Sequence, residues 1–224
     1  MPLCLNCKSL LREKAQYCHW CGQEVKRVGL FVDYENFRKI GWVRESGLST
    51  KRKGEVLKNH AARYGKVVCS WICAHPNNIR NWSQVKSDLQ QVGYEIAKPA
   101  EVVTGGIDRM FPSQADHALI RLLYEESLRS QPNLYIIVSG DIDYYEHIVM
   151  LIKKGYSVHL WGSKIDGHLS CKYYQLAQKY GQGVLKESGT GIFTIDNLDV
   201  IFHSQGVRRF FRRPNKDEPS TVAS

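Results

Sequence analysis

Residues 134–143 read LYIIVSGDID, and this stretch does most to decide the fold. It opens with an apolar run rich in β-branched side chains, which is typical of a buried strand. Gly140, Asp141 and Asp143 follow this run directly. Ligands of doubly wound α/β sheets bind at the carboxyl ends of the strands, so acidic residues at this point indicate a binding site.

Similar apolar runs recur along the chain, and segments with helical periodicity separate them. We expect strands at about residues 28–33, 66–74, 94–99, 134–139 and 157–161, and helices at about 51–64, 78–92, 115–130, 143–154 and 169–180. Strands that are apolar throughout, with helices long enough to cross between them, indicate a parallel sheet covered on both faces. The sequence therefore predicts a doubly wound α/β fold.

The composition is typical of a protein that binds a polyanion. The 224 residues include 31 Lys and Arg against 22 Asp and Glu, a formal net charge of +9, which favours a nucleic-acid partner. No stretch approaches the ~20 apolar residues of a membrane span, and no signal peptide is recognisable, so we expect a cytoplasmic protein that does not enter membranes. We divide the chain into residues 1–25, 26–206 and a basic, disordered tail at 207–224.

Four of the seven cysteines form two CxxC pairs near the amino terminus, Cys4/Cys7 and Cys18/Cys21. This spacing is typical of a structural zinc site with four thiolate ligands. About 25 residues cannot fold without such a staple. The segment Tyr17–Gly22 also resembles the second knuckle of short zinc ribbons. A closed site of this kind would dock RNA or a protein partner.

Asp33 ends the apolar run at 28–33, and Asp141 and Asp143 follow the run at 134–139. In a doubly wound sheet these three side chains point into one crevice. Carboxylates gathered there repel one another unless a cation compensates, which favours a hard divalent ion. Asp116, at the start of helix 115–130, is the natural fourth member. Turn or capping roles are the alternative for Asp116, Asp141 and Asp143.

Three motifs carry a family resemblance. They are Asp33-Tyr34-Glu35-Asn36, Ser113-Gln114-Ala115-Asp116 and Ser139-Gly140-Asp141-Ile142-Asp143-Tyr144. With them, residues from about 28 to 161 resemble the NYN domains of the PIN-like nuclease superfamily. The second motif departs from the family's KGVD-like pattern, because Gln114-Ala115 stands where Lys-Gly is usual.

The resemblance implies a PIN-like fold and a ribonuclease that depends on Mg²⁺ or Mn²⁺. Asp33, Asp116, Asp141 and Asp143 would hold one or two ions, and Asn36 and Ser139 would support the site. One alternative is a non-catalytic RNA- or protein-binding module on a degenerate nuclease scaffold, which the altered Gln114-Ala115 favours. Another is a structure-specific DNA nuclease, because DNA and RNA present the same phosphates.

Two further patterns concern partners. Three basic segments are candidate contacts for single-stranded or structured RNA, namely 51–53 (KRK), 153–154 (KK) and 208–213 (RRFFRR); cations neutralise phosphates and aromatic rings stack on bases. A solvated helix face explains 153–154 better, and a flexible solubilising end is an equal alternative for 208–213. Trp82, Val85 and Leu89 form one apolar stripe in the expected helix 78–92. We expect this stripe to pack on the sheet, and a homodimer contact is the alternative.

Overall fold

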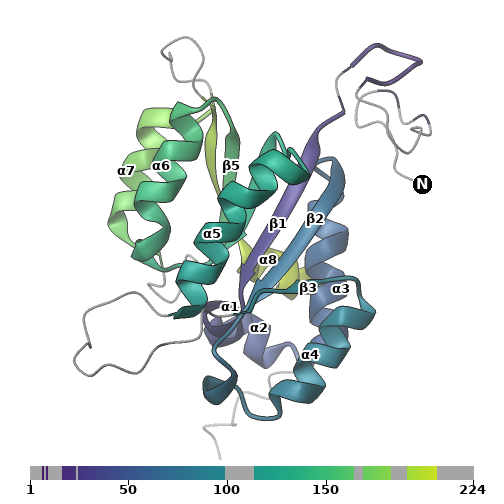
Figure 1. Cartoon of the computed structure of the whole chain (residues 1–224), viewed down its shortest axis with the longest axis vertical. Helices are drawn as coiled ribbons and strands as arrows, with labels where there is room; N and C mark the ends of the chain where they lie inside the picture. Colours follow the sequence, from purple (N-terminus) through teal and green to yellow (C-terminus); the bar gives the residue numbers. More distant parts are fainter. Residues whose placement is uncertain are drawn as a thin grey trace, which may run out of the picture.

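A six-stranded parallel sheet forms the centre of the molecule (Figure 1). The computed structural model describes residues 7, 9, 17–23, 25–98, 114–163, 169–182 and 191–205. Its elements are β1 (Arg27–Asp33), α1 (Tyr34–Lys39), α2 (Gly41–Glu45), α3 (Thr50–Ala61), β2 (Lys66–Cys73), η1 (Pro76–Asn78), α4 (Trp82–Gln91), β3 (Glu95–Ile96), α5 (Gln114–Arg129), β4 (Leu134–Val138), η2 (Ile142–Tyr144), α6 (Tyr145–Lys153), β5 (Ser157–Gly162), α7 (Cys171–Tyr180), β6 (Phe193–Asn197) and α8 (Leu198–Gln205).

The direction in which strands are added to the sheet reverses between the first and fourth strands. The strands lie in the order β3-β2-β1-β4-β5-β6, and all neighbouring pairs are parallel. The chain builds from β1 outward to β3 and then returns to add β4, β5 and β6 on the other side. The order thus reverses between β1 and β4, where such sheets bind their ligands. The doubly wound α/β fold expected from the sequence is confirmed.

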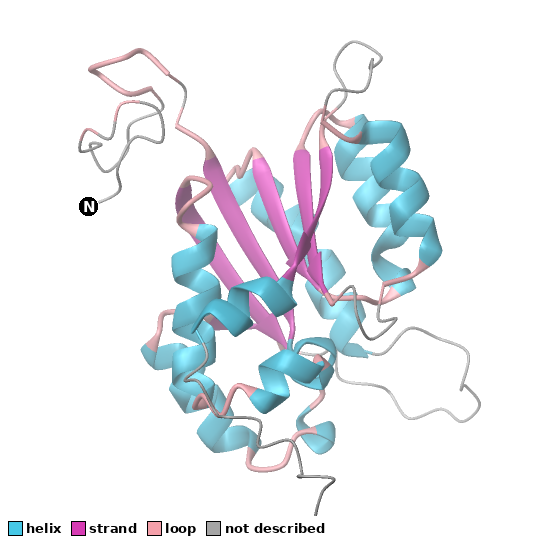
Figure 2. Cartoon of the chain, turned by 180° about the vertical axis from the view of Figure 1, so that it is seen from behind, coloured by secondary structure: helices cyan, strands magenta, loops and turns pink. Residues whose placement is uncertain are grey.

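Helices cover both faces of the sheet, as Figures 1 and 2 show. Successive side chains of a strand point to opposite faces. Leu30 and Val32 of β1 accordingly pack in one core with residues of α3, α4 and α8, whereas Phe31 packs in the other core with residues of α5, α6 and α7. The central strands are therefore buried on both sides, which explains why their sequences are apolar throughout.

The observed elements follow the expected ones closely, with three differences. The third strand is shorter than expected, because only Glu95–Ile96 pairs with β2. The expected helix 78–92 starts at Trp82, after a short 3₁₀ helix and a left-handed Asn81 with φ 58°. Four elements, α1, α2, β6 and α8, were not expected. They are short, with at most eight residues each, and their periodicity gives little signal over such lengths.

The apolar stripe of α4 packs against the sheet. Leu89 is buried in the core that α4 shares with α3, and Trp82 and Val85 pack against the same core. Packing on the sheet, the favoured expectation, accounts for the stripe, and the homodimer stays a prediction. Within the described part of the chain, no helix combines the length and apolar character that crossing a membrane requires. The expected tail at residues 207–224 lies outside the described residues.

Helix α3 provides a direct test of the packing. Leu57 of α3 is fully buried against the sheet, whereas Leu128 of α5 is 81% exposed. We expect Leu57→Ala to lower the free energy of unfolding by about 2–5 kcal/mol, because the substitution leaves a cavity in the core. The matched change Leu128→Ala should alter it by no more than about 0.5 kcal/mol. Urea unfolding of both variants measures the difference, and equal effects would contradict the packing of α3.

Candidate metal centre

Asp33 joins the end of β1 to the start of α1. Its Oδ1 accepts a hydrogen bond from the backbone N–H of Asn36 at 3.0 Å, so the aspartate caps the helix that follows. Its Oδ2 accepts a hydrogen bond from Ser139 Oγ at 3.1 Å. The pairing of Val32 with Val138 places these two residues, each one step further on, at the same edge of the sheet. Asp33 is buried.

The turn after β4 is held by the residues that the D-x-x-N and SGDxD motifs contribute. Asn36 Oδ1 accepts from the backbone N–H of Gly140 at 3.2 Å, and Ser139 Oγ accepts from the backbone N–H of Asp141 at 3.1 Å. Asp141 in turn caps η2, because its Oδ1 accepts from the backbone N–H of Asp143 at 3.2 Å. Asn36 and Ser139 therefore tie β1 to β4 and orient the two aspartates.

Asp116 reaches the same edge from the first turn of α5. Its side chain is buried, and its Oδ1 accepts a hydrogen bond from the hydroxyl of Tyr144 at 2.8 Å. Tyr144 belongs to η2, so this bond connects α5 to the turn that carries Asp141 and Asp143. Ser113 lies outside the described residues, as do the side chains of Gln114 and Ala115, so the environment of the altered KGVD-like motif is not described.

Three of the four predicted aspartates come together. A carboxylate oxygen from each of Asp116, Asp141 and Asp143 lies within 4.8 Å of the other two. This group of three, the acidic cluster, offers hard oxygen ligands of the type that Mg²⁺ and Mn²⁺ prefer. Among the described residues Asp33 does not join the cluster, and its two oxygens face Asn36 and Ser139 instead.

The electrostatics of the site favour a cation. Burial raises the pKa of Asp143, and the charges of Asp141 and Asp116 raise it further. Burial also raises the pKa of Asp33 to about 7, with a contribution from Asp116 that the hydrogen bonds from Asn36 and Ser139 partly oppose. Both carboxylates are thus harder to ionise than usual, and a bound cation would relieve that cost.

Two tyrosines of the site had no role in the sequence analysis. Tyr144 holds Asp116, and the hydroxyl of Tyr173, in α7, donates to the backbone carbonyl of Asp141. The position of Tyr144 directly after Asp143 could have identified it as a residue of the site. Tyr173 lies 32 residues beyond Asp141, and no local pattern of the sequence connects them.

A second group of metal-type ligands lies in the amino-terminal segment. The thiols of Cys7, Cys18 and Cys21 lie within 4.8 Å of one another, and Gly22, with φ 70°, donates its N–H to the carbonyl of Cys18 at 2.8 Å to close the knuckle. A hydrogen bond with Ser9 lowers the pKa of Cys18 to about 5, which favours the thiolate that binds zinc. Cys4, the predicted fourth ligand, lies outside the described residues.

Comparisons with known proteins support the family and the fold. The family model described as the NYN domain matches residues 27–180. A crystal structure of a protein of unknown function from Vibrio parahaemolyticus is similar to this one, with a TM-score of 0.52 and 18% sequence identity. The similarity covers 78% of this chain and 95% of that chain, and at this identity it supports the fold alone. No curated protein matches the sequence.

The raised pKa of Asp33 predicts how stability depends on pH in the presence of EDTA. Because the folded protein binds the Asp33 proton more tightly than the unfolded chain does, the wild type loses stability as pH rises from about 4 to the Asp33 pKa of about 7. Asp33→Asn keeps the helix cap but does not titrate. We expect the variant to be more stable than the wild type at pH 8, with a smaller advantage at pH 5. Urea unfolding measures the free energy of unfolding of both proteins at both pH values. If the variant is more stable than the wild type by the same amount at pH 5 and pH 8, Asp33 is not a buried carboxylate with a raised pKa.

Proposed function

Because this chain belongs to the NYN domain family, we propose that it is a ribonuclease that hydrolyses RNA phosphodiesters with Mg²⁺ or Mn²⁺. NYN domains are generally nucleases, so hydrolysis of a nucleic acid is the activity that membership supports at the coarse level. The choice of RNA rests on the family resemblance and on the positive net charge of +9.

One observation carries the proposal, the convergence of three carboxylates at the switch point of the sheet. Asp116, Asp141 and Asp143 would hold the ion, because their oxygens lie within 4.8 Å of one another and their ligand chemistry suits a hard cation. The chemistry supplied by bound Mg²⁺ or Mn²⁺ is activation of a water and neutralisation of charge on the phosphodiester. Without a cation the cluster would repel RNA phosphates.

The surrounding residues position the cluster. Tyr144 fixes one oxygen of Asp116, and Asn36 and Ser139 fix the turn that carries Asp141. In this proposal Asp33 acts through Ser139, with which it shares a hydrogen bond of 3.1 Å, and so orients Asp141 from the β1 side. Such outer contacts commonly decide how well a metal site binds and works.

A second candidate is a binding module without catalysis. The position of Asp33 favours it, because this aspartate lies outside the acidic cluster and its oxygens are engaged by protein donors. The cluster disfavours it, since a scaffold without a metal gains nothing from three carboxylates that repel one another. A structure-specific DNA nuclease would use the same residues, and substrate comparison separates it from a ribonuclease.

For the amino-terminal segment we propose a structural zinc ion bound by Cys4, Cys7, Cys18 and Cys21. The approach of Cys7, Cys18 and Cys21 supports this assignment, and reducing conditions such as those of the cytoplasm would preserve the thiols. Tyr17 and Trp20 are exposed beside the knuckle. Exposed aromatic rings of this kind suit docking to RNA bases or to a protein.

The nuclease proposal predicts that removing one carboxylate charge from the acidic cluster slows RNA cleavage. Asp141→Asn keeps the shape of the side chain but weakens the ion's ligand set, so cleavage of single-stranded RNA in Mn²⁺ should fall by roughly 100-fold or more. RNA binding in EDTA should persist or tighten, because the substitution removes a negative charge. Asp88→Asn, at a partly exposed site on α4, is the matched control. A wild type that binds RNA but cuts neither RNA nor DNA with either metal would favour the binding module.

The zinc assignment predicts a stoichiometry. Purified protein should contain about one zinc per chain, and Cys18→Ser should remove it because three thiolates hold the ion less well than four. Cys171→Ser changes an exposed cysteine of α7 and should leave the zinc in place. Elemental analysis measures the metal, and circular dichroism checks that the sheet domain still folds. Full zinc content in the Cys18 variant would refute the assignment.

A further inference from the structure

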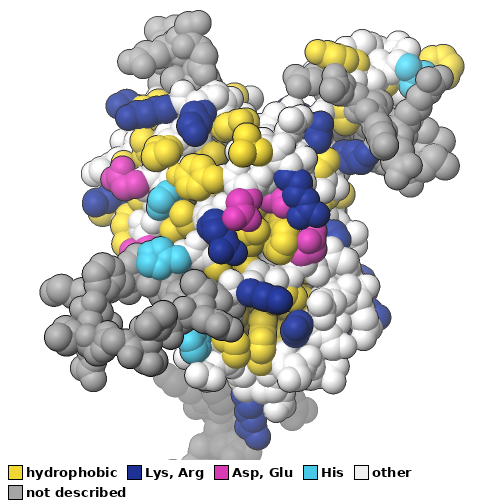
Figure 3. Space-filling view, viewed as in Figure 1, with side chains coloured by type: hydrophobic (Ala, Val, Ile, Leu, Met, Phe, Trp, Pro, Cys, Tyr) yellow, Lys and Arg dark blue, Asp and Glu magenta, His cyan; other side chains and the backbone are white. Residues whose placement is uncertain are grey.

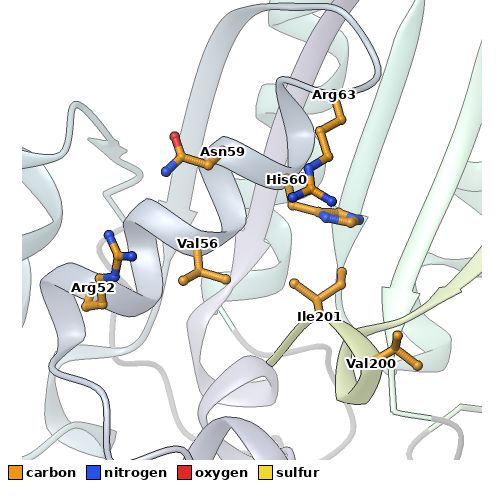
Figure 4. A pocket seen from close by; sticks show the side chains of 7 residues that line it. All are labelled: Arg52, Val56, Asn59, His60, Arg63, Val200 and Ile201. Carbon is orange, nitrogen blue, oxygen red and sulfur yellow. The ribbon is translucent and has the colours of Figure 1, made fainter. Parts of the chain in front are cut away.

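A pocket lies between α3 and α8, on the face of the sheet opposite α5. Figure 4 shows the side chains that line it, and its volume is about 280 Å³. Five lining residues come from α3 and the turn after it, and two come from α8; they are Arg52, Val56, Asn59, His60, Arg63, Val200 and Ile201. The polar side chains of the lining thus all come from α3 and the turn after it, whereas α8 contributes only apolar ones.

The charges at this pocket are positive. Arg52 belongs to the basic segment at residues 51–53, which the sequence analysis gave as a candidate RNA contact. In the structure, side chains of this segment have different surroundings. Lys51 bonds to Gln91 of α4 at 3.2 Å, whereas Arg52 lines the pocket. Arg52 also pairs with the partly exposed Glu55 at 2.9 Å. An ion pair open to solvent is worth little, so a phosphate can compete for this guanidinium.

His60 forms a fixed and neutral part of the wall. Its ring packs edge-on against Trp161, with centroids 5.0 Å apart, and against Tyr64, at 5.7 Å. Burial lowers the pKa of His60, and the charge of Arg63 lowers it further, although Asp196 opposes the shift. The imidazole is therefore uncharged near neutral pH and offers one donor and one acceptor, and Asn59 adds an amide.

This combination fits one nucleotide. Arginine forks match the oxygens of a phosphate, and Val56, Val200 and Ile201 provide an apolar surface for a sugar or base. The volume is near the lower end of the roughly 300–1,000 Å³ of small-molecule sites, which suits a single unit of a chain. We propose that the α3–α8 pocket holds one nucleotide of a single-stranded RNA, away from the acidic cluster, and this rests on the proposed ribonuclease function.

The position of the pocket suits a single-stranded RNA that runs from the acidic cluster along α3. The turn after α3 leads into the first residue of β2, so Arg63 lies near the amino edge of the sheet and Arg52 lies nearer the carboxyl edge, where the acidic cluster is. On the face shown in Figure 3, by contrast, basic side chains are scattered among acidic and apolar ones. RNA that leaves the cluster on the α3–α8 side would pass Arg52 first and then Arg63.

The test measures binding of a labelled single-stranded RNA to the full chain in EDTA, across a series of salt concentrations. Arg63→Gln should weaken binding several-fold and lower the steepness of the log–log salt dependence by ~0.7, the value for one phosphate contact on a single strand. Arg121→Gln is the control, because Arg121 lies on α5, across the sheet, and pairs only loosely with the exposed Glu125 at 3.2 Å.

A second pair of variants separates the pocket from overall charge. Val200→Glu places a carboxylate at the pocket, and Leu128→Glu places one on α5; both positions are exposed helical sites. We expect Val200→Glu to weaken RNA binding clearly more than Leu128→Glu does. An equal effect within each pair, or competition by poly-glutamate as strong as by unlabelled RNA, would overturn the proposal.

The outcomes also separate this proposal from the one it rests on. If the wild type binds and cuts RNA while Arg63→Gln and Val200→Glu bind it like their controls, the pocket assignment fails and the ribonuclease stands. If the wild type neither binds nor cuts RNA, both fail. Binding of free adenosine monophosphate that depends on Arg63, without any effect of Arg63→Gln on RNA affinity, would also contradict an RNA site.

Discussion

Repulsion among three carboxylates is the constraint on which the functional part of this structure depends. Asp116, Asp141 and Asp143 bring oxygens within 4.8 Å of one another, and like charges so close are costly unless a cation compensates. The fold holds them there with specific bonds. Tyr144 anchors Asp116, and Tyr173 binds the carbonyl of Asp141. These hydrogen bonds keep the carboxylates together, and the cluster could therefore bind a cation.

The parallel pairing of β1 with β4 supplies the frame for this arrangement. Because Val32 pairs with Val138, the residues that follow each strand meet at one edge, and Asp33, Asn36 and Ser139 cross-link the two turns. The sheet core is apolar on both faces, so these polar contacts are confined to the edge where the strand order reverses. The site is thus a consequence of topology, because α5 supplies Asp116 and the turn after β4 supplies Asp141 and Asp143.

The sheet could be predicted from the sequence because its strands are apolar runs, and the aspartates could be predicted because most of them follow those runs directly. The sequence analysis placed four aspartates in one set, whereas the structure groups three and turns Asp33 toward Ser139, a difference of side-chain direction that spacing does not encode. Tyr173 and the α3–α8 pocket were out of reach, because they join segments far apart in the chain. The basic segment 51–53 had nevertheless identified Arg52, which lines this pocket, as a candidate RNA contact.

The most direct test of the central claim is to locate the ion. A crystal grown with Mn²⁺ and measured near the manganese absorption edge identifies bound manganese by its anomalous scattering. The account predicts a peak bounded by the carboxylates of Asp116, Asp141 and Asp143, and its loss in crystals of an Asp116→Asn, Asp141→Asn double variant. No peak at this edge of the sheet at millimolar Mn²⁺, or a peak that survives in the double variant, would contradict it.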